Sequence, residues 1–131
     1  MSIQFIWEEK YAVGDPEIDS QHQRLFSLVN EVPETPSAQD IKQTIMFLFK
    51  YTRKHFRAEE DLMDQMDYPG LSQHQALHED LIGRLSDVAN NSWDTQDSII
   101  LFKQFVYDWL THHILSEDKR FFEFAHTCKA H

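Results

Sequence analysis

The chain has 131 residues, of which 41% are hydrophobic and 13% aromatic, enough for one packed domain and too apolar for a disordered chain. Its formal net charge of -10 argues against nucleic acid or an acidic membrane surface as a partner. The only cysteine, Cys128, leaves no intramolecular disulfide and no thiolate metal site to be built. Eight histidines in so short a chain are the feature that needs an explanation.

The first 17 residues are expected to form an arm that lies on the domain. Phe5, Ile6, Trp7 and Tyr11 lack helical spacing, and Gly14-Asp15-Pro16 is a turn signal. The N-terminus shows no basic region followed by an apolar one, and no stretch has the length needed to span a bilayer. We therefore expect a cytoplasmic protein without membrane insertion.

Four stripes of apolar residues and histidines follow, with steps of three and four residues that are typical of one helix face. The stripes are Ile18, His22, Leu25, Val29 and Val32; Ile41, Ile45, Leu48, Thr52, His55, Glu59, Leu62 and Met66; His74, His78, Leu81, Leu85 and Val88; and Ile99, Phe102, Val106, Trp109 and His113. Pro33 and Tyr68-Pro69-Gly70 end the first two, Ser37 with Asp40 resembles a capping box before the second, and the third stops near Asn90.

Together the stripes predict an all-α fold, an up-down-up-down antiparallel four-helix bundle. The bundle is expected over residues 18–118, after an N-terminal arm over 1–17 and before a short C-terminal helix or tail over 119–131. No linker or internal repeat divides the chain, so residues 1–131 are expected to form a single domain.

Five histidines and one glutamate fall on these stripes, which meet on the bundle axis: His22, His55, Glu59, His74, His78 and His113. A single buried histidine usually finds ordinary hydrogen-bond partners. Five from four helices, joined by a carboxylate, are harder to satisfy because they compete for few protons. A metal cation accepts several lone pairs at once and neutralises the carboxylate. The pattern therefore predicts a metal site at the centre of the bundle.

Spacing and ligand type narrow the choice of metal. His74 and His78, like His55 and Glu59, are i,i+4 pairs whose side chains project from one helix face. Gln75 follows His74, so the catalytic glutamate of the zinc protease motif is missing. Imidazole suits zinc, copper, nickel and iron. More than four ligands exceed one tetrahedral zinc, so two octahedral ions, preferably iron, fit better.

In chain order, residues 19–26, 55–60, 74–78 and 109–118 resemble the motifs of the hemerythrin family, in its single-domain bacterial form, and the match runs from about Trp7 to Phe122. The resemblance implies two iron ions (Fe2+/Fe3+) joined by an oxo or hydroxo bridge. It assigns one iron to His74, His78 and His113 and the other to His22 and His55, with Glu59 and Asp118 bridging them. One coordination position then stays open on the two-histidine iron, where dioxygen binds in the family.

One of these assignments conflicts with helical spacing. Glu117 lies four residues after His113 and is rotated from it by only ~40°, whereas Asp118 is rotated by ~140°. The family pattern selects Asp118, so we expect a π-bulge or local irregularity at this point. Three further histidines are expected to stay outside the site, either off the stripe or in the tail: His112, His126 and His131.

The resemblance implies reversible dioxygen binding, for storage, transport or delivery to an oxygen-consuming protein partner, and no catalysis. Leu25, Phe56, Trp109, Leu110 and Ile114 match positions that line the oxygen pocket of the family, although the same residue types build an ordinary core. Five neutral imidazoles and two carboxylates supply less negative charge than carboxylate-rich oxidase centres, which favours oxygen carriage.

Two other functional classes are compatible with the motifs. An oxygen or redox sensor would need an output domain or a separate partner, and a di-iron enzyme with peroxidase or nitric-oxide chemistry would need the open iron site to accept a substrate. We expect a monomer, because the acidic surface favours self-repulsion.

Overall fold

The computed structural model describes residues 5–34, 38–89 and 96–129. Its elements are the 3-10 turn η1 (Glu9–Tyr11), the helices α1 (Pro16–Glu31), α2 (Ala38–Gln65), α3 (Leu71–Ala89) and α4 (Gln96–His113), the π-helical turn η2 (Ile114–Asp118) and α5 (Lys119–Lys129). No strand occurs in the described part of the chain. The predicted all-α four-helix bundle is therefore confirmed.

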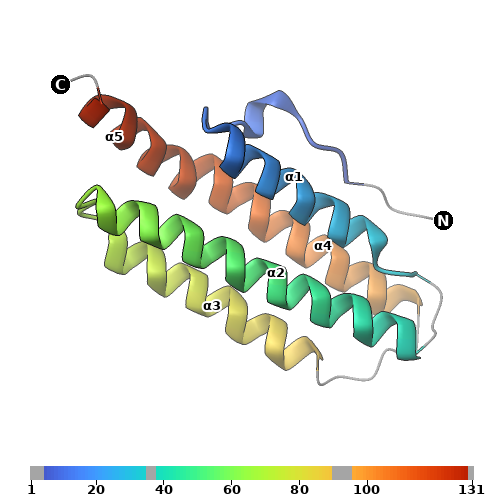
Figure 1. The fold of residues 1–131 in the computed structure, drawn as a ribbon. Helices are drawn as coiled ribbons and strands as arrows, with labels where there is room; N and C mark the ends of the chain where they lie inside the picture. Colours follow the sequence, from blue (N-terminus) through green and yellow to red (C-terminus); the bar gives the residue numbers. More distant parts are fainter. Residues whose placement is uncertain (1–4, 35–37, 90–95, 130–131) are drawn as a thin grey trace.

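The helices run along a common direction (Figure 1). α2 packs against both α1 and α3, and α4 packs against α1. α4, η2 and α5 form one unbroken helical rod, so the predicted C-terminal helix continues the fourth helix of the bundle. Because successive helices alternate in direction, side chains from all four meet along the bundle axis.

The N-terminal arm is tied down by specific contacts. The ring of Phe5 stacks on Tyr107 with 4.3 Å between ring centroids. The backbone N–H of Phe5 donates to Oδ1 of Asn30 at 2.8 Å, and the amide of Asn30 donates back to the carbonyl of Phe5 at 2.8 Å. These contacts hold Phe5 against α1 and α4.

Local chemistry sets the start of α1. Oδ1 of Asp15 accepts hydrogen bonds from the backbone N–H groups of Glu17, at 3.0 Å, and Ile18, at 3.1 Å. Pro16 occupies the first helical position, where its missing N–H costs nothing. The helix therefore begins two residues before the first residue of the apolar stripe. The predicted capping box needs Ser37 and the side chain of Asp40, and the predicted end of the third helix is near Asn90; Ser37, Asn90 and that side chain lie outside the described part of the chain.

One buried lysine forms an ion pair that the helical stripes did not reveal. Lys103 is only 1% exposed, and its ammonium donates to the carbonyl of Val32 at 3.0 Å and pairs with Glu34 at 2.9 Å. It therefore satisfies a carbonyl at the C-terminal end of α1 from a neighbouring helix. None of the described helices is both long and apolar enough to cross a bilayer.

Candidate metal centre

Seven predicted site residues lie together at the middle of the bundle, each at most 4% exposed. They are His22 from α1, His55 and Glu59 from α2, His74 and His78 from α3, His113 from the end of α4, and Asp118 from η2. Their ligand atoms form two groups that share both carboxylates. The fold thus brings five imidazoles and two carboxylates together in the buried centre of the bundle.

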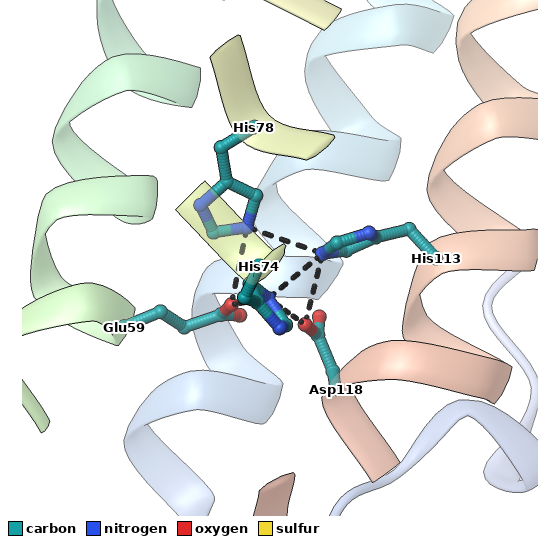
Figure 2. Close-up of side chains that lie close together, drawn as sticks. All are labelled: Glu59, His74, His78, His113 and Asp118. Atoms are coloured by element: carbon teal, nitrogen blue, oxygen red, sulfur yellow. Dashed lines mark hydrogen bonds and ion pairs between the residues drawn. The ribbon is translucent and has the colours of Figure 1, made fainter. Parts of the chain in front are cut away.

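The first group contains three histidines and the two carboxylates, which Figure 2 shows pointing toward one another. Nε2 of His113 lies 3.0 Å from Nε2 of His74 and 3.1 Å from Nε2 of His78. Oδ1 of Asp118 lies 3.0 Å from Nε2 of His74 and 3.1 Å from Nε2 of His113. Oε1 of Glu59 lies 3.2 Å from Nε2 of His74. Five potential ligand atoms therefore surround one point.

The second group contains two histidines and the other oxygen atom of each carboxylate. Oε2 of Glu59 lies 2.9 Å from Nε2 of His55 and 3.2 Å from Nε2 of His22. Oδ2 of Asp118 lies 3.2 Å from Nε2 of His22. Each carboxylate thus presents one oxygen to each group, which is the arrangement of a bridging ligand. The second group has four potential ligand atoms, one fewer than the first.

The π-helical turn explains how Asp118 reaches the site. The backbone N–H of Lys119 donates to the carbonyl of Ile114, five residues earlier, so η2 holds one residue more than an α-helical turn. The extra residue returns Asp118 to the face that carries His113. Glu117, which α-helical spacing would choose, belongs to neither group and lies 3.7 Å from Arg120 in an ion pair. The expected local irregularity is confirmed.

The hydrogen bonds behind the histidines fit a metal site. Nδ1 of His55 donates to the amide oxygen of Gln21 at 2.6 Å, and Nδ1 of His78 donates to the carboxylate of Glu60 at 2.8 Å, because both partners are acceptors there. In the neutral imidazole this leaves the Nε2 lone pair directed at the centre of each group. A ligating histidine commonly holds its second nitrogen in this way.

The short distances between imidazole nitrogens inside the site are not explained by hydrogen bonds alone. Three Nε2 atoms within 3.1 Å of a neighbouring Nε2 need a proton between each pair or a shared cation. Oδ1 of Asp118 is buried and has no hydrogen bond of acceptable geometry in the described residues, despite its short distances to two imidazoles. Lone pairs that converge without pairing are what a metal ion satisfies, so the residues present fit such an ion.

The two carboxylates also change the proton affinity of the histidines. Burial lowers the pKa of His22 and of His74, but the hydrogen bonds and negative charges of Asp118 and Glu59 outweigh burial and raise each pKa to about 9. For His55, burial dominates and lowers the pKa. Burial raises the pKa of Glu59, but the surrounding imidazoles outweigh it and hold the pKa well below its usual value. The metal-free site therefore stores protons that a cation must displace.

Apolar side chains enclose the centre. Phe56 stacks on the ring of His78, with centroids 3.6 Å apart and planes within 1°, and lies 6.0 Å from His55. Trp109 stacks on His113 with centroids 4.5 Å apart. Both aromatic rings therefore stack on histidines of the three-histidine group, and Phe56 also lies next to a histidine of the other group. The other expected pocket residues, Leu25, Leu110 and Ile114, are buried in the same core.

Sequence reasoning missed two supporting residues, Gln21 and Glu60. Each is the direct neighbour in sequence of a predicted ligand, His22 or Glu59, but each supports a histidine from another helix. Such pairing depends on how the helices pack, so helical spacing does not reveal it. His112 and His126 are exposed, as expected, while His131 and the side chain of Cys128 lie outside the described residues.

Known proteins share both the sequence pattern and the fold. Residues 13–125 match the hemerythrin HHE cation binding domain. The chain is 26% identical to a bacteriohemerythrin from Clostridium acetobutylicum over 91% of this chain and 99% of that protein. It is 29% identical to the myohemerythrin of Sipunculus nudus over 89% of this chain and 90% of that protein.

The fold agrees with these relatives. The crystal structure of a wild-type hemerythrin superposes with a TM-score of 0.80 at 27% identity, covering 91% of this chain and 95% of the other. The family match spans most of the chain, and the buried histidines and carboxylates lie in two groups that share both carboxylates. The chain belongs to the hemerythrin family.

Proposed function

We propose that this protein binds dioxygen reversibly at a non-haem di-iron centre, for oxygen storage or for delivery to an oxygen-consuming protein. The proposed ligands are the seven clustered residues: His74, His78 and His113 for one iron, His22 and His55 for the other, and Glu59 and Asp118 for both. The observation that carries the proposal is the unequal pair of groups that share two carboxylates. The four-donor group leaves the more room for an external ligand.

The distances between donor atoms favour octahedral ions over tetrahedral zinc. Two ligand atoms at right angles with bonds of ~2.1 Å lie ~3.0 Å apart, whereas a tetrahedral ion separates them by ~3.4 Å. Five pairs of donor atoms in the first group lie 3.0 to 3.2 Å apart, and a sixth, Nε2 of His78 and Oε1 of Glu59, lies 3.5 Å apart. An imidazole-rich octahedral site with bridging carboxylates suits iron.

The surroundings of the site suit binding without turnover. When bound, two ferrous ions would supply the electrons that dioxygen takes up and returns. Phe56 and Trp109 cover His78 and His113 by stacking, and Leu25 and Ile114 are at most 1% exposed. This apolar shell limits the entry of water, so fewer solvent protons reach the centre. Five neutral imidazoles also leave the ligand set less negative than a carboxylate-rich one.

The test is an anaerobic-to-aerobic optical titration of protein loaded with Fe(II), with iron counted per chain. We expect two irons per chain and visible absorption that appears with oxygen and disappears when oxygen is removed. Irreversible oxidation at the first exposure, or sustained turnover of an added peroxide or nitric oxide, would contradict oxygen carriage and favour the sensor or enzyme alternative.

Two alanine variants make this test specific to the site. His22→Ala removes a donor from the four-donor group and is expected to abolish the reversible oxygen response. His112→Ala changes an exposed histidine next to His113 and should leave both the iron count and the oxygen response unchanged. Equal responses of the two variants would contradict the proposed ligand assignment.

We further propose that the protein acts as a monomer in the cytoplasm. Its formal charge of -10 makes two copies repel each other at long range. Sedimentation at several protein concentrations should give one species with the mass of a single chain, and a mass that rises with concentration would contradict this.

A further inference from the structure

The outward face of α2 carries five cations in an otherwise acidic protein. This basic face consists of Lys42, Lys50, Arg53, Lys54 and Arg57, all exposed. At 100° per residue the five side chains fall within ~120° of the helix circumference. Residues 41–58 contain no aspartate or glutamate, so this segment carries +5 and the remaining residues together carry -15.

The cations of the basic face form no ion pair with the carboxylates of the described residues. Five of the six other described basic residues form ion pairs: Lys10, Arg24, Arg84, Lys103 and Arg120. None of the five on the basic face pairs with a described carboxylate, and Arg53 instead lies over the ring of Phe49, 5.9 Å from its centroid. This contrast within one chain sets the face apart from an ordinary solvated surface.

The arrangement costs helix stability and has no evident role in the fold. Four like-charged pairs at spacings of three or four residues are formed by Lys50, Arg53, Lys54 and Arg57, and each pair is unfavourable because the two cations repel each other on one helix face. The pairs lie in the middle of α2, away from the last turn before Gln65, so they do not offset the helix dipole. A binding role would explain why this surface has so many unpaired cations.

Apolar side chains accompany the charges. A shallow hollow of about 510 Å³ on this face is lined by Met46, Phe49 and four of the cations. Met46 is 56% exposed and its neighbour Phe47 is 54% exposed, among the most exposed large apolar side chains described. An apolar centre with a charged rim is the usual composition of a protein interface.

We propose that the basic face of α2 docks a partner protein through an acidic segment that places an apolar side chain against Met46 and Phe49. Charge complementarity selects this occupant. A second copy of the chain would bring another net charge of -10, and an anionic membrane would repel the remaining -15.

The test uses full-length iron-loaded protein and a labelled synthetic helical peptide whose glutamates surround one leucine. We expect anisotropy to report binding that weakens as salt is raised, and carbodiimide cross-links from peptide carboxylates to Lys42, Lys50 or Lys54. A peptide with serine in place of the leucine should bind more weakly. No binding at low salt, or cross-links mapped only to other lysines, would overturn the proposal.

Two charge-reversal variants separate a specific face from general attraction. Lys50→Glu with Arg53→Glu should weaken peptide binding by about tenfold or more, whereas Arg84→Glu with Arg120→Glu, the same charge change elsewhere, should have little effect. Equal weakening by both pairs would overturn the proposal. Binding of the protein to phosphatidylserine vesicles but not to the peptide would also overturn the proposal. The same holds if the Lys50→Glu and Arg53→Glu changes abolish self-association of the protein and leave peptide binding unchanged.

Discussion

Metal binding at this centre should displace protons from two histidines. In the metal-free protein, Glu59 and Asp118 outweigh the effect of burial and raise the pKa of His22 and His74 to about 9. A metal ion binds only the deprotonated Nε2 atom, so each imidazolium must lose its proton as the metal enters. The predicted observable is therefore the number of protons released per chain.

The pKa values set the size of this effect. At pH 7.5 a group with a pKa of about 9 is ~97% protonated, whereas a histidine with the ordinary pKa of ~6.5 is ~9% protonated. The two residues together should release ~2 protons per chain instead of ~0.2. His74 should contribute more of the released protons than His22. A protonated His22 would have an N–H at Nδ1 with no acceptor among the described residues, which disfavours its protonated form. One proton is thus the lower bound, and apparent affinity should rise ten- to 100-fold per pH unit below pH 9.

Calorimetric titration of the metal-free protein with Zn2+, in two buffers of different ionisation enthalpy, measures this number without redox chemistry. Asp118→Asn, which removes a cause of both pKa shifts, should reduce the protons released, and Glu117→Gln should not, since Glu117 lies outside both groups. Release of less than half a proton per wild-type chain would refute the reasoning, as would equal behaviour of the two variants.

Three further predictions concern stability. The raised pKa values of His22 and His74 stabilise the metal-free fold fully below pH ~6.5, and this contribution is lost as the pH rises through about 9. Urea unfolding should therefore show lower stability at pH ~9 than at pH ~6.5, and a rise in stability would contradict this prediction. Lys103→Met should cost ~3 kcal/mol in urea unfolding, because it removes the buried ammonium that pairs with Glu34 and satisfies the carbonyl of Val32. Adding Glu34→Leu should restore part of the loss, and a loss under ~1 kcal/mol would count against a structural ion pair. Asp15→Ala should cost ~1 kcal/mol by removing the cap of α1, and Asp15→Ser, which keeps a capping oxygen, should cost less; thermal denaturation that ranks the two equally would argue against the cap.

Helical spacing was sufficient to predict the bundle and most of the clustered side chains. His22, His55, Glu59, His74 and His78 lie on apolar stripes, and a stripe that faces the core determines the direction of each side chain. Asp118 is different, because regular α-helical geometry selects Glu117 and only the family resemblance indicated otherwise. A π-turn is a local exception to the periodicity on which such reasoning depends.

Features that depend on packing between helices were beyond this reasoning. Glu60 and Gln21 support histidines of neighbouring helices, and nothing in the spacing of one helix shows which residue of another lies opposite. For Lys103, the burial could be predicted but the ion-pair partner could not. It lies four residues after Ile99 on the apolar stripe, so its buried position could have been predicted, but its partner Glu34 lies beyond the end of α1.

The rod formed by α4, η2 and α5 ties the position of Asp118 to the packing of the C-terminal helix. Closing η2 to an α-helical turn would rotate everything downstream by ~100° and carry Phe121 and Phe122, which are at most 4% exposed, out of the core. The C-terminal helix therefore locks the register that keeps Asp118 beside His113. Because helix packing sets this register, a metal ion that binds here would not have to spend binding free energy on forming the π-turn.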